Sequence, residues 1–326
     1  MRFIIYGAGA IGGAIGARLF EQGHEVVLIA RGANLEAIRR DGLTVASPTS
    51  TDRFEITAVA HPSALEIRDT DVVILAMKTQ DTAAALDALA DVAAPSTSVV
   101  CAQNGVENER LALRRFSGVL GMCVVCPATY LEPGRVELLW APSSGVLDLG
   151  RWPAGSDERA EAIAGALRAA TFASVAREDI SRWKWGKLVL NLGNAVEAAC
   201  GHDGDAATLA ELVRDEGVTC LHAAGIDFAS AEEFASRRAS LDLSGAPPTP
   251  SRAGGSTWQS LARGAGSVET DYLTGEVVLL GRLVGVPTPA NDLLQDVARV
   301  LARARQSPGS VAAAELLERL GHRRGR

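Results

Sequence analysis

The feature that most constrains the fold is a cluster of glycines between a short apolar run and a helical pattern. Residues 2–6 read RFIIY, and the next six residues, GAGAIG, place Gly7, Gly9 and Gly12 in the spacing GxGxxG. Residues 11–22 then have helical spacing. A strand that turns at once into a helix needs glycines there, because the turn is tight and the two elements pack closely. The pattern predicts a strand–turn–helix unit that opens an α/β domain.

Strands and helices continue to alternate through the first half of the chain. We expect strands over 25–31, 71–77 and 97–105 and a helix over 83–92. This alternation indicates a doubly wound, mostly parallel sheet. Residues 119–150 carry short strands and turn signals, and we expect them to form a β extension that closes the sheet domain.

Helical periodicity dominates from about residue 178 onward. The chain is long enough for two domains, so we expect a Rossmann-type α/β domain over 1–177 and an all-helical domain over 178–326. Within the helical part, residues 242–256 are crowded with Pro, Gly and Ser. A loop of that length inside a compact domain is either disordered or functional.

The composition limits the classes of partner. With 47% hydrophobic and 22% charged residues, the chain has the composition of a soluble globular protein. Its net charge of -7 argues against nucleic acid or an anionic membrane surface as the main partner. The N-terminal residues could be read as a secretory signal, but their glycines would make a poor hydrophobic region. Since no later apolar run approaches the roughly 20 residues that span a bilayer, we expect a cytoplasmic protein.

Two of the five cysteines, Cys123 and Cys126, form a CxxC. This spacing could indicate redox or metal chemistry. It lies in a β-branched run, however, where positions three apart point to opposite faces of a strand. No second CxxC or Cys/His pair in the sequence completes a metal site. We therefore expect buried strand cysteines and no metal.

The glycine cluster also predicts a ligand. Gly7 allows the tight turn, Gly9 lets the pyrophosphate of a dinucleotide approach the backbone, and Gly12 lets helix and strand pack closely. The helix N-terminus adds N–H donors and a positive dipole end. We expect the cofactor phosphates at the loop residues, which are Gly7, Ala8, Gly9, Ala10, Ile11 and Gly12.

The second strand ends with Arg31, which bears on the choice of dinucleotide. A site that prefers NAD usually carries Asp or Glu there to bind the ribose hydroxyls. A guanidinium can instead bind the 2′-phosphate of NADP in a bidentate manner. Arg31 therefore favours NADPH, and the alternative is a surface arginine that extends from a strand end.

Lys78 and Asn104 stand where two further strands end. Both strands run in the same direction as the first, so their ends face the crevice where such sheets bind ligands. These residues are candidates for the cofactor site. The alternatives are a solvated lysine and a turn asparagine before Gly105.

Two of the chain's three lysines lie in an otherwise nearly apolar helical stretch, WKWGKLVLNLGN at 183–194. On one continuous helix Lys187, Asn191 and Asn194 fall within about 60° of one another, because each residue turns the helix by about 100°. A narrow polar stripe on a buried helix has to face a cleft, or its groups would lack partners. The alternative is a lysine that reaches solvent from the helix start, with the asparagines bonded in the core.

These motifs and their order give the chain a resemblance to the ketopantoate reductase (2-dehydropantoate 2-reductase) family over nearly its whole length. Besides the glycine cluster, the motifs are LAMKTQD, QNGV, WGKLVLN, STWQSLARG, VETDYLTGEVV and GVPTPAN. The resemblance implies a Rossmann domain followed by a helical domain, with the active site in the cleft between them. It also implies an enzyme that uses NADPH to reduce ketopantoate, a 2-oxo acid, to pantoate in pantothenate biosynthesis.

The resemblance implies roles for single residues. Lys187 matches the catalytic lysine, and Glu269 matches the acidic residue that contacts the substrate and helps to place that lysine. The implied substrate-binding positions are Asn104, Asn191 and Ser256, and the polar stripe adds Asn194 as a further candidate. The implied cofactor-binding positions outside the glycine cluster are Arg31, Lys78, Asn104 and Glu269.

Lys184 does not match the catalytic lysine. We expect it to start the helix and to reach solvent, so its replacement should be mild. Two features differ from the family's usual pattern: Ala195 stands where an asparagine is usual, and one extra residue precedes Glu269. Both leave the hydride chemistry intact and keep a different 2-oxo acid open as the substrate.

Two further alternatives have other chemistry. A non-catalytic NADPH-binding sensor would be expected to lack the lysine–glutamate pair, Lys187 and Glu269. An opine-type dehydrogenase would be expected to use histidine, and no histidine here lies beside a motif. We expect a small-molecule 2-oxo acid as partner, no nucleic acid or membrane, and a monomer or homodimer.

Overall fold

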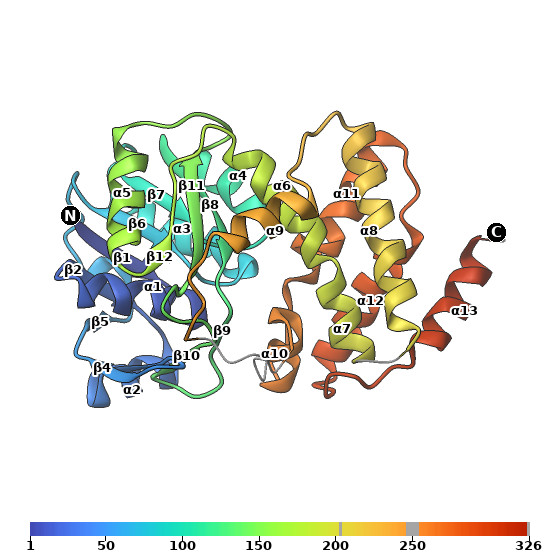
Figure 1. Ribbon diagram of the computed structural model, residues 1–326, viewed down its shortest axis with the longest axis horizontal. Helices are drawn as coiled ribbons and strands as arrows, with labels where there is room; N and C mark the ends of the chain where they lie inside the picture. The colour runs from blue at the N-terminus through green and yellow to red at the C-terminus, as the bar shows by residue number, and fades with distance from the viewer. Residues whose placement is uncertain (202–203, 246–253, 325–326) are drawn as a thin grey trace. The chain divides into compact units, whose positions relative to one another are not determined.

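The computed structural model describes residues 1–201, 204–245 and 254–324, and the chain divides into two compact units (Figure 1). The first unit comprises Met1–Lys184 and Glu232–Pro250. The second comprises Trp185–Ala231 and Ser251–Arg326. Most of the loop expected over 242–256 lies outside the described residues.

The first unit is built on a mostly parallel sheet. Its strands are β1 (Arg2–Tyr6), β2 (Glu25–Ile29), β5 (Thr57–Val59), β6 (Val72–Leu75), β7 (Ser98–Cys101), β8 (Gly118–Val125), β11 (Gly145–Arg151) and β12 (Phe172–Ala173). Their order is β12-β11-β8-β7-β6-β1-β2-β5. All neighbours from β8 to β5 pair in parallel, and β11 is antiparallel to β8. The predicted doubly wound sheet is confirmed.

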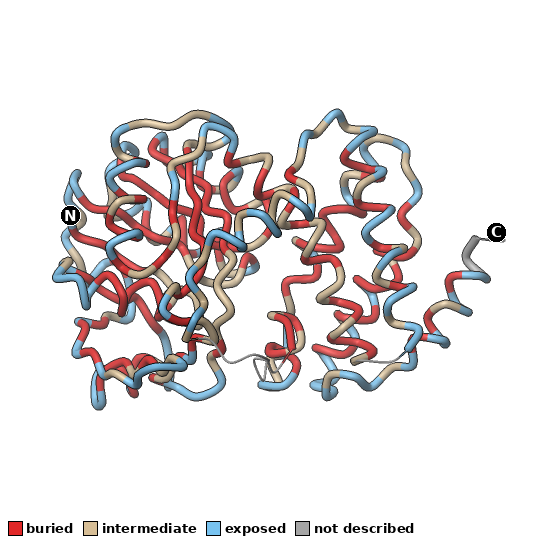
Figure 2. The backbone as a smooth tube through the Cα atoms, in the orientation of Figure 1, coloured by how far each residue is buried: buried red, intermediate tan, exposed pale blue. Residues whose placement is uncertain are grey.

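Side chains alternate between the two faces of this sheet, and each face has its own helices. Phe3 and Ile5 lie in one core cluster with α1 (Ala10–Glu21), α2 (Gly32–Asp41) and α5 (Glu158–Ala169). Ile4, between them, lies in another cluster with α3 (Thr82–Ala90) and α4 (Glu107–Leu113). Strands covered on both faces have to be apolar throughout, and Figure 2 shows the sheet as buried.

The predicted β extension divides between two sheets. β8 extends the parallel sheet and β11 adds the antiparallel strand, but β9 (Ala128–Thr129) and β10 (Arg135–Leu138) join a second sheet, ordered β4-β3-β10-β9. The partner of β10 there is β3 (Leu43–Ala46), which is followed by β4 (Thr51–Phe54). The sequence did not indicate β3 and β4. They pair locally with each other, whereas the pairing of β3 with β10 depends on residues far along the chain.

Two glycines of the β1–α1 turn are required by its geometry. Gly7 has φ of 104°, in the region that side chains disfavour. A Cβ on Gly12 would lie 2.0 Å from the carbonyl oxygen of Gly7 and 2.9 Å from Ile5. The turn is therefore as tight as the sequence predicts.

The described part of the second unit consists of helices. They are the end of α6 (Ile180–Asn191), α7 (Gly193–Cys200), α8 (Ala206–Ala223), α10 (Ser256–Ala262), η3 (Glu269–Tyr272), α11 (Thr274–Val284), α12 (Pro289–Arg303) and α13 (Ala313–Arg324). One core cluster contains side chains of α7, α8, α11, α12 and α13. The predicted helical region is thus confirmed. The remaining helix, α9 (Ala231–Ala239), lies almost wholly in the first unit. Across the described ranges, no helix is both long and apolar enough to cross a membrane.

Candidate active site

The glycine loop connects β1 to α1 in the first unit. Gly9 immediately precedes the helix, and its carbonyl oxygen accepts from the N–H of Gly13 at 2.7 Å. A Cβ built on Gly9 would meet no atom within 4 Å, whereas Gly12 is packed against the turn. The loop is therefore open at the position where a pyrophosphate would approach the first turn of α1. These residues fit a dinucleotide.

Asn34 supports this loop from α2, although the sequence did not single it out. Its amide nitrogen donates to the carbonyl oxygen of Ala8 at 2.8 Å. Its amide oxygen accepts from the N–H of Gly134, also at 2.8 Å. The sequence feature that could have pointed to Asn34 is a polar side chain in the first turn of the helix after Arg31. Gly134 is 100 positions away, so the contact itself could not be foreseen.

Arg31 lies at the end of β2, directly before α2. Its guanidinium is 3.3 Å from the carboxylate of Asp81, and the two side chains are 72% and 41% exposed. An exposed pair of this kind contributes little stability, so Arg31 can exchange Asp81 for another anion. Burial raises the pKa of the Tyr6 hydroxyl, and Arg31 acts against this while Asp81 adds to it. The ends of β1, β2 and β6 thus bring three polar groups together.

Lys78 and Asn104 follow the neighbouring strands β6 and β7, and both are half-buried. A set of hydrogen-bonded residues, which we call the loop network, joins the two loops; its members are Thr79, Thr82, Gln103, Asn104 and Asn108. Asn108 donates to the hydroxyl of Thr79 and to the carbonyl oxygen of Asn104, both at 3.2 Å. Thr82 donates to Asn108 at 2.8 Å and accepts from the Gln103 amide at 2.7 Å. The network fixes both loops at one edge of the sheet.

The expectation that Lys184 starts its helix and reaches solvent is wrong. α6 begins at Ile180, and Lys184 is only 2% exposed. Its ammonium donates to the carbonyl oxygen of Gln103 at 2.9 Å and pairs with the carboxylate of Glu109, which is fully buried. A buried ammonium requires such a partner. Glu109 is 75 positions away in the sequence, so local spacing gave no sign of it.

Lys187 and Asn191 form the polar pair expected on α6. The Lys187 ammonium donates to the side-chain oxygen of Asn191 at 2.9 Å. Asn191 is 5% exposed, and its amide nitrogen has no hydrogen-bond partner among the described residues. Buried donors are nearly always bonded. This nitrogen is therefore a donor available to a ligand beside the lysine.

The prediction of one continuous helix from Lys187 to Asn194 is wrong. α6 ends at Asn191, and α7 begins at Gly193. Between them the N–H of Leu192 bonds to the carbonyl oxygen three residues back, at 3.3 Å, which tightens the chain locally. Asn194 thus lies in the first turn of the next helix, and Leu192 between the two helices keeps right-handed helical dihedral angles, with φ of -59° and ψ of -35°.

Asn194 lies beside the segment that carries Ser256. A Cβ on Gly255 would be 3.0 Å from the side-chain oxygen of Asn194. The N–H of Gly255 donates to the carboxylate of Glu197, on α7, at 2.9 Å. Ser256 follows as the first residue of α10. The structure therefore brings these two predicted substrate-binding residues into one neighbourhood of the second unit.

Glu269 and Ala195 are both buried in the second unit, at 7% and 6% exposure. Glu269 is the first residue of η3. Ala195 belongs to the apolar core cluster of the unit. Its methyl group packs among apolar side chains and cannot take the place of an amide.

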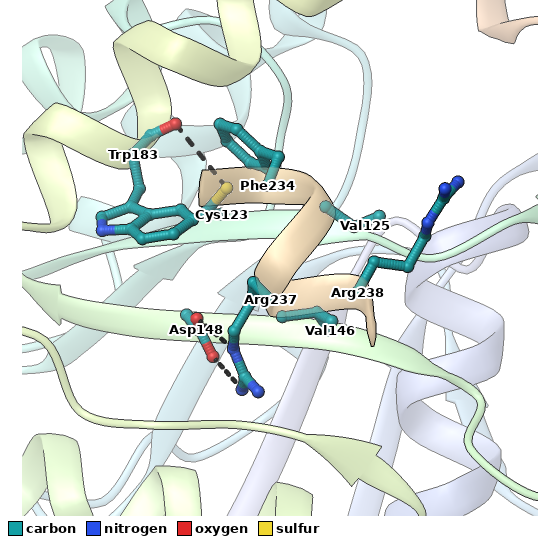
Figure 3. Close-up of a pocket in the computed structure, with 8 residues that line it drawn as sticks. All are labelled: Cys123, Val125, Val146, Asp148, Trp183, Phe234, Arg237 and Arg238. Carbon is teal, nitrogen blue, oxygen red and sulfur yellow. Dashed lines mark hydrogen bonds and ion pairs between the residues drawn. The ribbon is translucent and has the colours of Figure 1, made fainter. Parts of the chain in front are cut away.

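The pocket in Figure 3 lies where α9 packs on the sheet of the first unit, and none of the candidate site residues lines it. Asp148 of β11 is 1% exposed and receives both Arg237 of α9, at 2.8 and 2.9 Å, and Arg177, at 2.8 Å. The two guanidinium groups compensate the buried carboxylate. The contacts hold α9 against the sheet.

Of the two CxxC cysteines, Cys123 lines this pocket. Cys123 is buried on β8, and its thiol is 3.7 Å from the carbonyl oxygen of Trp183. Cys126 is half-buried just after the strand, and burial raises its pKa to about 12. A thiol that stays protonated is a poor nucleophile and a poor ligand. Within the described residues no cluster of His, Cys, Asp or Glu could hold a metal ion.

Comparison with known proteins gives the same family in both parts of the chain. Residues 3–154 match the family described as Ketopantoate reductase PanE/ApbA, and residues 179–302 match its C-terminal domain. The 2-dehydropantoate 2-reductase of Mesorhizobium japonicum is 32% identical, and the match covers 94% of this chain and 99% of the relative. The 2-dehydropantoate 2-reductase of Pyrococcus horikoshii is 29% identical, with 95% and 99% covered.

Solved structures share the architecture. A PanE/ApbA family ketopantoate reductase from Ralstonia eutropha JMP134 has a TM-score of 0.79 at 28% identity, covering 94% of this chain and 99% of that one. D-mandelate dehydrogenase, solved with NADH and anilino(oxo)acetate, has a TM-score of 0.80 at 22% identity over 94% and 99%, and shares the fold. Both family matches and a full-length relative agree, and the chain therefore belongs to the ketopantoate reductase family of NAD(P)-dependent oxidoreductases.

Proposed function

We propose that the protein reduces a 2-oxo acid to a 2-hydroxy acid with NADPH, and that the substrate is 2-dehydropantoate (ketopantoate), which becomes pantoate. Relatives named for this activity align with almost the whole chain. The observation that carries the proposal is the contact of the Lys187 ammonium with Asn191, whose buried amide nitrogen has no partner among the described residues.

Lys187 is the group that we assign to the developing charge. When bound, the reduced nicotinamide supplies a hydride to the ketone carbon. Negative charge then builds on the ketone oxygen, and a positioned ammonium can stabilise it and donate the proton. The oxygen of Asn191 orients the ammonium, and we assign to Glu269 the placing of the lysine.

The substrate carboxylate needs donors that do not take the proton from Lys187. The amide nitrogens of Asn191 and Asn194 and the hydroxyl of Ser256 are such donors. Asn194 lies beside the segment of Ser256. We assign these three residues, with Asn104, to substrate binding.

For the cofactor we propose NADPH. The open side of the glycine loop suits the pyrophosphate, and Arg31 would take the 2′-phosphate in place of its weak contact with Asp81. Lys78, Asn104 and Glu269 complete the proposed cofactor contacts.

A different 2-oxo acid is the second candidate, and Ala195 favours it. The family's usual asparagine is absent at this position, and the methyl group that replaces it is in the apolar core. A non-catalytic sensor is less consistent with the chain, since both Lys187 and Glu269 are present.

The substrate is tested by steady-state oxidation of NADPH with a panel of 2-oxo acids. We expect kcat/KM to be highest for ketopantoate, above that for pyruvate, 2-oxoisovalerate and phenylglyoxylate. Turnover of another acid without turnover of ketopantoate would establish the second candidate. Binding of NADPH without turnover of any acid would establish the sensor.

Arg31→Asp tests the cofactor assignment. A hydrogen bond to a charged group is worth about 1.5–3 kcal/mol, so NADPH affinity should fall roughly 10- to 100-fold while NADH affinity changes little. Arg40→Asp is the matched control, because Arg40 is equally exposed, at 72%, and makes the same change of charge. An unchanged ratio of NADPH to NADH affinity in Arg31→Asp would show that Arg31 does not bind the phosphate.

Lys187→Ala separates chemistry from cofactor binding. Loss of the general acid should lower the single-turnover rate by roughly 10²–10⁴. NADPH affinity should hardly change, because the glycine loop and Arg31 bind the phosphates in this proposal. Stopped-flow rates and a cofactor titration on the same preparation measure both. A variant that keeps the wild-type rate would remove Lys187 from the mechanism.

A further inference from the structure

The ion pair of Lys184 and Glu109 connects several segments of the first unit. Besides Glu109, the Lys184 ammonium binds the carbonyl oxygen of Gln103, the residue directly before Asn104. Glu109 is on α4 and follows Asn108, which holds the carbonyl oxygen of Asn104 in the loop network. The pair therefore joins α6, α4 and the loop of Asn104.

The neighbouring strand β8 leaves room for this pair because it carries a glycine there. A Cβ on Gly121 of β8 would lie 3.3 Å from both the Glu109 carboxylate and the Lys184 side chain. The second carboxylate oxygen of Glu109 is buried and has no hydrogen-bond partner among the described residues. The other titratable groups that act on Glu109 or are acted on by it are Cys101 of β7 and Glu107. Lys184 is thus the cation that compensates this carboxylate.

Lys187 follows one turn later on the same helix, about 4.5 Å further along its axis. We infer that Lys184 and Glu109 are positioning residues, which hold the loop of Asn104 on the cofactor side to the helix that carries Lys187. The inference rests on the proposed function for the roles of Asn104 and Lys187. It goes beyond that proposal because neither member of the pair touches substrate or cofactor in it.

Removal of one partner leaves the other as an uncompensated buried charge. Burial raises the pKa of Glu109, and the Lys184 ammonium acts in the opposite direction. In Lys184→Met the largest effect that opposes burial is gone and only a backbone hydrogen bond still lowers the pKa of Glu109, so Glu109 is protonated at low pH and ionises as the pH rises. An ionised Glu109 then has to reach water, and α4 and the loop of Asn104 move with it.

Glu109→Gln leaves the opposite charge. The ammonium of Lys184 is then the uncompensated buried charge. Cofactor binding should therefore weaken with rising pH in Lys184→Met, and it should be weaker than in the wild type in Glu109→Gln. The double variant carries no uncompensated charge and should have no pH dependence of this kind.

The test is the NADPH dissociation constant of each variant divided by that of the wild type, from fluorescence titrations between about pH 6 and pH 9. We expect this ratio to rise at least about tenfold for Lys184→Met over the range, to lie above one for Glu109→Gln, and to be constant and closer to one for the double variant. Asp87→Asn is the control, because it breaks an exposed ion pair with Arg115 in the same unit. Its ratio should stay near one.

A pair that only stabilises the fold would lower the melting temperature of both single variants and leave the ratio for Lys184→Met independent of pH. That result would overturn the inference. If Lys184→Met does not fold, a ratio for Glu109→Gln that lies above one and returns toward one in the double variant supports the inference, and a ratio that stays near one overturns it. The titration needs no turnover, so a wild type that binds NADPH but reduces no 2-oxo acid would contradict the proposed function alone. Should the wild type bind only NADH, the same ratios are measured with NADH.

Discussion

The parallel pairing of β1 with β2 and β6, and of β6 with β7, is the constraint on which the first unit depends. Parallel strands end at one edge of a sheet, so residues far apart in the sequence become neighbours there. Arg31, Lys78 and Asn104 follow three of these strands, and the glycine loop follows the fourth. Because helices cover both faces, this edge is where the fold leaves polar groups for a ligand.

Holding polar groups at a buried edge requires that nearly all of them have partners. In the loop network these partners are neutral groups, whereas Lys184 and Glu109 are charged partners of each other. A buried ion pair is weak evidence for stability, since apolar side chains of similar volume often stabilise a fold as well or better. Because the pair lies beside Gln103 and Asn104, its presence is better explained by a need to hold these residues in place. The same reasoning applies in the second unit to Asn191, which holds the Lys187 ammonium and keeps one donor unused.

Features encoded over short distances could be predicted from the sequence. The β1–α1 turn, the apolar strands and the contact of Lys187 with Asn191 each depend on residues within one or two elements. Contacts that depend on the tertiary arrangement could not. The burial of Lys184 depends on Glu109, which is 75 positions away, and the role of Asn34 depends on Gly134, which is 100 positions away. The boundary between α6 and α7 at Leu192 is likewise not encoded in helical periodicity.

In the function that we propose, the chain delivers a hydride from NADPH to the ketone carbon of a 2-oxo acid. The most direct measurement is mass spectrometry of the product formed with NADPH deuterated at C4, with each of the two C4 positions labelled in turn. We expect that one of the two labelled cofactors gives pantoate with a single deuterium at C2 and that the other gives unlabelled pantoate. Oxidation of NADPH without deuterium in the product from either cofactor would contradict direct hydride transfer.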